Sequence, residues 1–224
     1  MTAHVHAQPL TSRPVLRGWS HALAVPAAML FTGALAERCL GDRPRLASMI
    51  VYGLSLIVMY GWSAAYHIVT WSPVQRRFMR QVDHANIFLV IAATSTAIGA
   101  NVLDGWQRVA LLVAVWTPTV IGLLMMGLRV RLTSGVRVAL YIATGLTGLI
   151  ALPGLLAALP LPAILILIAG GLLYAIGGVV YSARVPNPAP RIFGYHEVFH
   201  LLVIAGGIAF GIVVWVWVVP FVRA

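Results

Sequence analysis

The sequence predicts an all-α fold of the polytopic membrane class, a bundle of seven transmembrane helices. The first observation is composition: 61% of the 224 residues are hydrophobic and only 9% are charged, against about 45–50% and about 25% in soluble domains. The second is the presence of seven apolar stretches of about 20 residues, the length that a membrane-spanning helix needs. The third is the distribution of the fifteen arginines, which lie between those stretches in small groups and not on one face. We therefore expect no nucleic-acid partner.

The apolar stretches follow one another with short polar connections. Residues 1–16 form a short polar tail, and residues 17–224 are expected to fold as a single transmembrane domain. Interior prolines at Pro118 and Pro153 are compatible with membrane helices, because neighbouring helices satisfy the freed backbone groups. The predicted spans are 18–40, 46–69, 83–103, 108–128, 137–158, 162–182 and 195–219.

The connections also predict an orientation. With seven spans, the side of the N-terminus carries ten arginines and the opposite side carries five. The positive-inside rule then places the N-terminus in the cytoplasm and the C-terminus outside, in the inner (plasma) membrane of the cell. The ten are Arg13, Arg17, Arg76, Arg77, Arg80, Arg129, Arg131, Arg137, Arg184 and Arg191; the five are Arg38, Arg43, Arg45, Arg108 and Arg223.

The histidines inside the predicted spans, together with Asp83 and Glu197 beside them, all fall near the cytoplasmic ends of their helices. Such residues are costly in a membrane and are candidates for function. Because chance would scatter them over both ends of the bundle, their common depth predicts one site. They are His21, His67, Asp83, His84, His196, Glu197 and His200.

Residue spacing indicates a zinc site there. Ser63 and His67 are four residues apart, as are His196 and His200, so each pair shares one helix face. Two histidines at this spacing form half of a zinc site, and His67 supplies a third nitrogen. Catalytic zinc typically has three protein ligands and a water molecule. Asp83 then lies outside the coordination sphere of the zinc and orients or deprotonates the bound water. Ser63 forms a hydrogen bond with this water or with a substrate carbonyl.

Other interpretations of the same residues stay open. The segment from His196 to His200 reads HEVFH, which matches the HExxH signature of zinc proteases with Glu197 as general base, but that scheme leaves Asp83 and Ser63 without a role. Alternatively, the histidines only hydrogen-bond between helices, Asp83 caps a helix, and Glu197 pairs with an arginine or a ring N–H group. His21 and His84 are expected to be interfacial or packing residues.

Three polar motifs, and their order along the chain, resemble those of the hemolysin III family, the bacterial branch of the group that contains the progestin and adiponectin receptors. The resemblance implies a seven-helix bundle with a cytoplasmic N-terminus and a zinc ion near the cytoplasmic face. It also implies that His67, His196 and His200 are the ligands, with Asp83 and Ser63 beside the metal-bound water. The motifs are Ser63-x-x-x-His67, Arg80-Gln81-Val82-Asp83-His84 and Phe193-Gly194-Tyr195-His196-Glu197-Val198-Phe199-His200.

The leading hypothesis is a Zn²⁺-dependent hydrolase of lipid amide or ester bonds, because relatives in the receptor branch are associated with hydrolysis of lipid amides such as ceramide. Membrane lipids are then both the environment and the substrate. One alternative is a non-enzymatic sensor or receptor-like bundle with a structural zinc, in which Asp83 closes the fourth coordination position. Another is a pore, as the family name suggests, although the spans are too apolar to line an aqueous channel.

Overall fold

The computed structural model describes residues 13–130 and 132–222. Residues 1–12 of the predicted tail, together with Arg131 and Arg223, lie outside the described residues.

Helices make up the fold, and the described residues contain no β-strand. Seven segments are long and apolar enough to cross a membrane, which confirms the predicted fold class. The fifth of them comprises two helices with a 3₁₀ turn between them, and the seventh ends in a π-helical turn. The elements are α1 (Trp19–Arg38), α2 (Arg43–Ile68), α3 (Pro73–Val102), α4 (Gly105–Gly127), α5 (Ser134–Leu146), η1 (Thr147–Ala151), α6 (Leu152–Ala158), α7 (Leu161–Ala183), α8 (Tyr195–Val213) and η2 (Val214–Val218).

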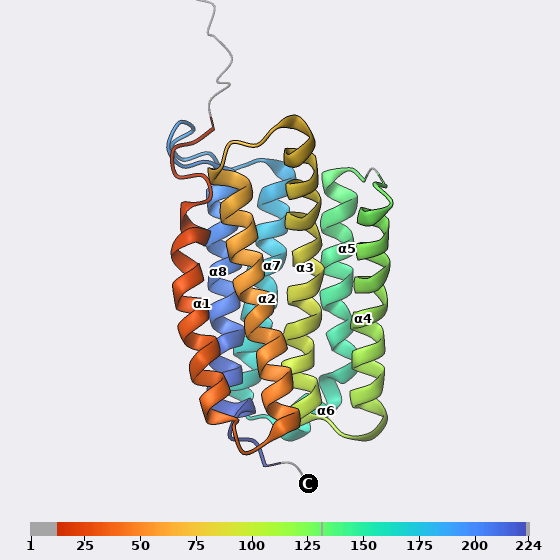
Figure 1. Ribbon diagram of the computed structural model, residues 1–224. Helices are drawn as coiled ribbons and strands as arrows, with labels where there is room; N and C mark the ends of the chain where they lie inside the picture. Colours follow the sequence, from red (N-terminus) through yellow and green to blue (C-terminus); the bar gives the residue numbers. More distant parts are fainter. Residues whose placement is uncertain (1–12, 131, 223–224) are drawn as a thin grey trace, which may run out of the picture.

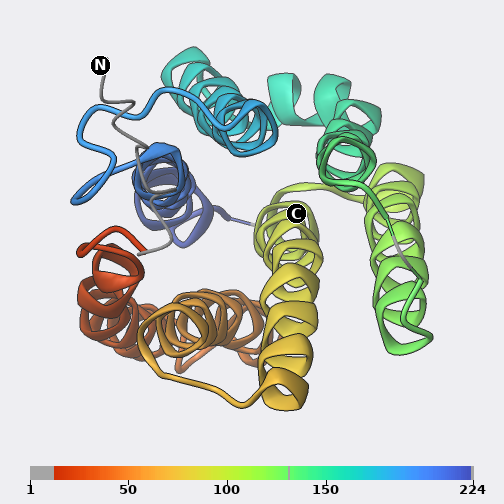
Figure 2. The ribbon, with the colours of Figure 1, turned by 90° about the horizontal axis from the view of Figure 1, so that it is seen from above.

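The spans run alternately down and up (Figure 1). The connections α2–α3, α4–α5 and α7–α8 lie at one end, here called the upper end, and the seventh span ends at the lower end. Seen from above, α1, α2, α3, α5, α7 and α8 follow one another around a ring (Figure 2). Helix α8 closes this ring by packing on both α7 and α1, and α4 packs outside it against α3.

Helix α3 begins ten residues before the predicted start of the third span, at Pro73. The prediction was wrong because residues 73–82 are too polar to resemble a membrane span. Local capping makes them helical: the Ser72 hydroxyl accepts from the Gln75 backbone N–H, and the Gln75 side chain accepts from the Ser72 N–H. The additional turns carry the exposed Arg76 and Arg77 above the bundle.

The fifth span is interrupted near Pro153, which starts α6 as one of its first residues and does not lie inside a continuous helix. Proline is favoured in the first turn of a helix, where its missing N–H needs no partner. By contrast, Pro26 and Pro118 lie inside α1 and α4. The break brings η1 against α4.

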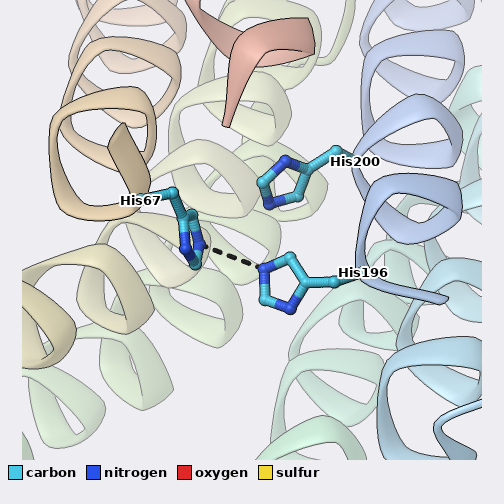
Figure 3. A group of neighbouring side chains, drawn as sticks. All are labelled: His67, His196 and His200. Atoms are coloured by element: carbon cyan, nitrogen blue, oxygen red, sulfur yellow. Dashed lines mark hydrogen bonds between the residues drawn. The ribbon is translucent and has the colours of Figure 1, made fainter. Parts of the chain in front are cut away.

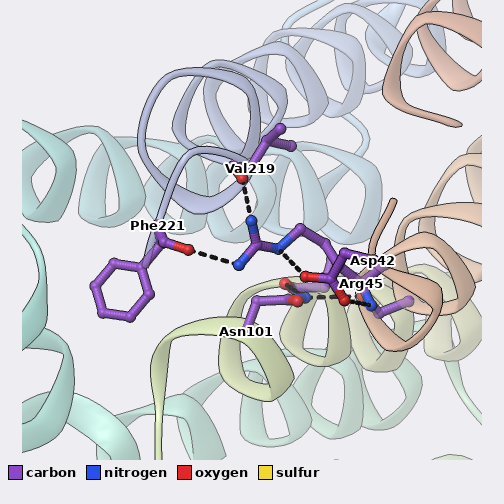
Figure 4. Close-up of polar contacts among 7 residues, drawn as sticks. Asp42, Arg45, Asn101, Val219 and Phe221 are labelled. Atoms are coloured by element: carbon purple, nitrogen blue, oxygen red, sulfur yellow. Dashed lines mark hydrogen bonds and ion pairs between the residues drawn. The ribbon is translucent and has the colours of Figure 1, made fainter. Parts of the chain in front are cut away.

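At the lower end, hydrogen bonds from Arg45 link the end of the seventh span to α2 (Figure 4). Its guanidinium donates to the backbone carbonyls of Val219 and Phe221 and forms an ion pair with Asp42. Beside it, the Asn101 amide donates to the Ser48 hydroxyl at 2.8 Å. The carbonyls at a helix C-terminus lack partners within the helix, so Arg45 satisfies groups that would otherwise be left unpaired.

Candidate metal centre

Three histidines from two helices converge near the upper end of the bundle (Figure 3). His67 lies one residue before the end of α2, and His196 and His200 lie in the first turns of α8. One ring nitrogen from each lies within 4.8 Å of the other two. The structure therefore brings together the three residues that the sequence predicted as metal ligands.

The geometry of the three rings fits a metal ion. The Nε2 atoms of His67 and His196 are 3.0 Å apart and hydrogen-bonded, as the alternative interpretation of these histidines expects (Figure 3). As ligands of a tetrahedral zinc with Zn–N bonds of 2.0–2.1 Å, the same two atoms would stand about 3.3 Å apart. The ring planes are inclined to one another by 76°, 56° and 71°, so no two of these three rings are stacked. In addition, His200 Nδ1 is buried and makes no hydrogen bond within the described residues.

Asp83 and Ser63 form a pair beside this cluster. The Ser63 hydroxyl, on α2 one turn before His67, is hydrogen-bonded to the Asp83 carboxyl on α3. Ser63 is buried, and both residues line the same cavity as His196. Asp83 does not belong to the group of converging ligand atoms, which in the described part of the chain contains only the three histidines. The predicted fourth protein ligand of a structural site is thus not supplied by Asp83.

A cavity of about 430 Å³ extends from this pair into the bundle. It follows α3 from Asp83 to Ile98, about 22 Å of helix at 1.5 Å per residue. The commonest residues of its walls are isoleucine, leucine and valine, and Leu155, Ile164 and Phe210 lie toward its lower end. The polar groups lie mainly at the upper end, so the cavity has one reactive end and one apolar end.

His84 and Arg137 add a cationic group at the upper end of the cavity. Arg137, at the start of α5, approaches both ring nitrogens of His84 at 2.8 and 3.0 Å and donates to the carbonyl of Leu132. The Tyr181 hydroxyl lies 3.4 Å from His84 Nε2, and its ring packs against His196. Arg137 makes no ion pair with a carboxylate in the described part of the chain. It therefore presents a positive charge beside Asp83 and the histidines.

Glu197 faces away from the three histidines, although it follows the first of them in sequence. One of its carboxylate oxygens is ion-paired with the guanidinium of Arg17, and the other accepts the Gly194 backbone N–H at 2.7 Å. The side chain is almost fully buried. This bears out the interpretation of Glu197 as the partner of an arginine, and it leaves no free oxygen to act as the base of an HExxH site.

Residues 13–18 cross the upper end of the bundle above the cluster. Arg13 donates to the His67 carbonyl at 3.1 Å, and the backbone N–H groups of Val15 and Leu16 donate to the loop between α7 and α8. Gly18 has a φ of 87°, and a Cβ there would stand 2.8 Å from the His67 Cβ. Only glycine allows this backbone conformation and this close approach without strain.

His21 was expected to be an interfacial or packing residue, and the structure places it directly against a predicted ligand. Its ring stacks on His200, with centroids 3.8 Å apart and planes within 11° of parallel. A metal ion bound in the plane of one ring would lie well outside the plane of the other. His21 therefore supports the His200 ring and does not share its metal.

Comparisons with known proteins find relatives that match most of the chain. The sequence profile of a family described as Haemolysin-III related matches residues 10–210. The chain belongs to this family. Hemolysin-3 of Bacillus cereus is 25% identical over 206 residues, which cover 92% of this chain and 90% of that protein. A Hemolysin-3 homolog of Bacillus subtilis (strain 168) is 26% identical over 164 residues, covering 73% and 74% of the two chains. No solved structure matches the chain.

In this haemolysin-III related protein, sequence reasoning found the residues of the cluster but missed two of their neighbours. Arg137 was counted only as a charge that orients the chain, although its position at the start of an apolar stretch was a usable signal. The role of Arg17 left no local signal, because its partner lies 180 positions away.

Proposed function

We propose that this protein is a zinc-dependent hydrolase of lipid amide or ester bonds that acts at the cytoplasmic face of the membrane. The observation that carries the proposal is a combination: three convergent histidines and a hydrogen-bonded Ser63–Asp83 pair stand at the reactive end of a long apolar cavity. A metal centre without such a cavity would equally suit a structural role. A cavity without the polar pair would equally suit a lipid anchor.

His67, His196 and His200 would hold the metal, because all three offer a nitrogen at suitable separation. When bound, zinc would polarise a substrate carbonyl and lower the pKa of a water ligand to about 7. Three protein nitrogens leave one tetrahedral position for water or substrate, which is the arrangement of catalytic zinc sites.

Asp83 is the general base and acid of the proposed reaction. Its carboxylate takes a proton from the attacking water and returns it to the leaving amine or alcohol, a function that carboxylates perform in many hydrolases. The Ser63 hydroxyl donates to this carboxylate and so fixes its orientation. Because Ser63 is also on the cavity wall, its oxygen is placed to accept a hydrogen bond from the attacking water.

The cavity would bind the hydrocarbon part of the substrate. Its length of about 22 Å along α3 accommodates an extended chain of roughly eighteen bonds, at about 1.2 Å per bond. Arg137 would attract the polar or anionic part of the lipid, since its charge has no carboxylate partner among the described residues. The substrate is thus held with its scissile bond beside Asp83.

The orientation in the membrane follows from the same arginine distribution. Arg76, Arg77, Arg80, Arg129 and Arg184 lie at the upper end of the bundle, the end that also holds the cluster. The positive-inside rule assigns this end to the cytoplasm, so the proposed site faces the inner leaflet.

The test is to purify the protein, measure its zinc content, and assay labelled lipid amides and esters with Asp83→Asn as the key variant. We expect zinc in the wild type, and in the variant the same zinc content with turnover reduced at least about 100-fold. Asp104→Asn, an exposed carboxylate near the lower end, is the matched control and should leave turnover unchanged. Wild-type protein without zinc overturns the proposal. Zinc without turnover on any lipid indicates a structural metal in a sensor-like bundle.

A further inference from the structure

A set of buried polar groups outside the proposed reaction runs from the metal centre toward the middle of the bundle. Both ring nitrogens of His21 and the hydroxyls of Tyr174 and Tyr52 are buried, and none makes a hydrogen bond of normal geometry within the described residues, although the His21 ring lies close to the His200 backbone. They come from α1, α7 and α2 and face α8. Most buried polar groups in proteins are hydrogen-bonded, so this concentration needs an explanation.

These groups form one continuous column. His21 stacks on His200, and the Tyr60 ring follows at 5.1 Å from the His21 ring. The hydroxyls of Tyr60 and Tyr174 then meet at Gly207, where a Cβ would stand 2.7 and 3.6 Å from them. We call His21, Tyr60, Tyr174 and Tyr52 the phenol column.

The lower end of the phenol column lies one helical turn farther along α8. The Tyr52 hydroxyl is 3.9 Å from the position of a Cβ on Gly211. From His200 to Gly211 the column spans about 16 Å of α8 at 1.5 Å per residue. Gly207 and Gly211 have the spacing of a helix-packing motif, and here they leave room for phenol hydroxyls beside the α8 backbone.

An unpaired hydroxyl or imidazole nitrogen is more costly here than in a soluble protein, since bulk water does not reach the core of a membrane. Ordered water molecules with two or more polar partners are the usual way in which proteins satisfy such groups. A water molecule between Tyr60 and Tyr174 at Gly207 would have two partners, and a further one would link Tyr52 to them.

We propose that the phenol column is an internal water site, in which ordered water molecules join His21 to the hydroxyls of Tyr60, Tyr174 and Tyr52. Water fits better than a lipid chain because the groups are neutral and can each donate and accept a hydrogen bond. The space beside Gly207 and Gly211 on α8 is also narrow, whereas a hydrocarbon chain has the apolar cavity available, whose wall includes His21 and Tyr174.

The water site has a structural consequence for the metal centre. Water bonded to the His21 ring nitrogens fixes the plane of that ring, and the His21 ring in turn fixes the plane of His200 by stacking. This inference goes beyond the proposed hydrolysis and holds whether or not the protein is an enzyme.

The first experiment is millisecond radiolysis of the full-length protein in lipid nanodiscs prepared in H₂¹⁸O, which generates hydroxyl radicals from water next to the side chains. We expect ¹⁸O-labelled oxidation of Tyr52 and Tyr174 well above that of Phe88. Phe88, between α3 and α4, is buried like Tyr52 and serves as its internal control, whereas Tyr174 is half-buried and lines the cavity. Labelling of Tyr52 at or below the level of Phe88 overturns the proposal.

The second experiment uses the sign of a stability change. If water satisfies the hydroxyls, Tyr52→Phe and Tyr174→Phe lose hydrogen bonds, and the Tm of each variant falls. If the hydroxyls are unsatisfied, their removal relieves a penalty and the Tm rises. Tyr195→Phe, a partly exposed tyrosine at the upper end of α8, is the matched control. The proposal requires a lower Tm in both variants, and a Tm equal to or above that of the wild type in either one overturns it.

Discussion

The guanidinium of Arg17, just before α1, is ion-paired with the carboxylate of Glu197 in the first turn of α8. The Glu197 side chain is 2% exposed and that of Arg17 is 17% exposed, so the pair is largely shielded from solvent. Since Glu197 adjoins His196, the pair fixes the start of α8 and joins it to the segment that crosses the upper end of the bundle. The carboxylate therefore contributes to structure and not to proton transfer.

We expect Arg17→Ala to destabilise the protein by about 3 kcal/mol, because the substitution leaves a buried carboxylate without its partner. Adding Glu197→Gln to this variant should restore much of the loss, since the buried charge is then removed as well. The measurement is thermal or denaturant unfolding of both single variants and the double variant in detergent. Strictly additive changes would contradict the coupling of the two residues.

Arg137→Gln should weaken substrate binding more than it slows the chemical step. The arginine lies at the upper end of the cavity beside His84 and lacks a carboxylate partner among the described residues, so its charge is available to the polar part of a lipid. We predict about a tenfold rise in KM with zinc content unchanged, which corresponds to about 1.4 kcal/mol. Arg76→Gln, an exposed arginine at the same end, should have no effect on KM. An unchanged KM in Arg137→Gln would show that Arg137 does not contact the substrate.

Two glycines on neighbouring helices provide a test of the packing between α1 and α2. A Cβ on Gly53 would stand 2.3 Å from the Thr32 hydroxyl oxygen, whereas a Cβ on Gly33 would meet nothing within 4 Å. Gly53→Ala should therefore destabilise by about 1–3 kcal/mol through overpacking. Gly33→Ala should be neutral or stabilising by up to about 1 kcal/mol through helix propensity. Equal Tm values for the two variants would contradict the close α1–α2 contact.

Arg45→Ala should loosen the lower end of the bundle. The substitution leaves the carbonyls of Val219 and Phe221 without their donor, at a cost of about 1–3 kcal/mol. Arg43→Ala, an exposed arginine two residues earlier, is the control and should change stability by less than about 0.5 kcal/mol. Hydrogen exchange at the end of the seventh span reports the same change locally. Protection that is identical in the two variants would argue against the Arg45 contacts.

Much of the fold could be predicted from the sequence because length and hydropathy determine which segments can cross a membrane. The boundaries of α1, α4 and α7 agree with the predicted spans to within a few residues. The start of α3 was missed because Ser72 and Gln75 cap a polar helix that extends beyond the apolar region. The break at η1 was missed because Pro153 was interpreted as a tolerated interior proline and not as the start of a new helix.

The candidate site was predicted for a different reason. Where polar residues are rare, their depth and spacing alone indicated that His67, His196 and His200 would meet, and the structure brings them together. The stacking of His21 on His200 could not be predicted, because α1 is apolar on most faces and its rotation about its own axis leaves no pattern in the sequence. Contacts that depend on such rotations emerge only when the helices pack.

The most direct test of the central claim is a crystal structure of the purified protein with anomalous diffraction measured on both sides of the zinc absorption edge. We predict an anomalous peak between the ring nitrogens of His67, His196 and His200, at about 2.0–2.1 Å from each, with water and not a protein side chain in the fourth position. No zinc peak at the three histidines, or a fourth protein ligand that closes the site, would contradict the account.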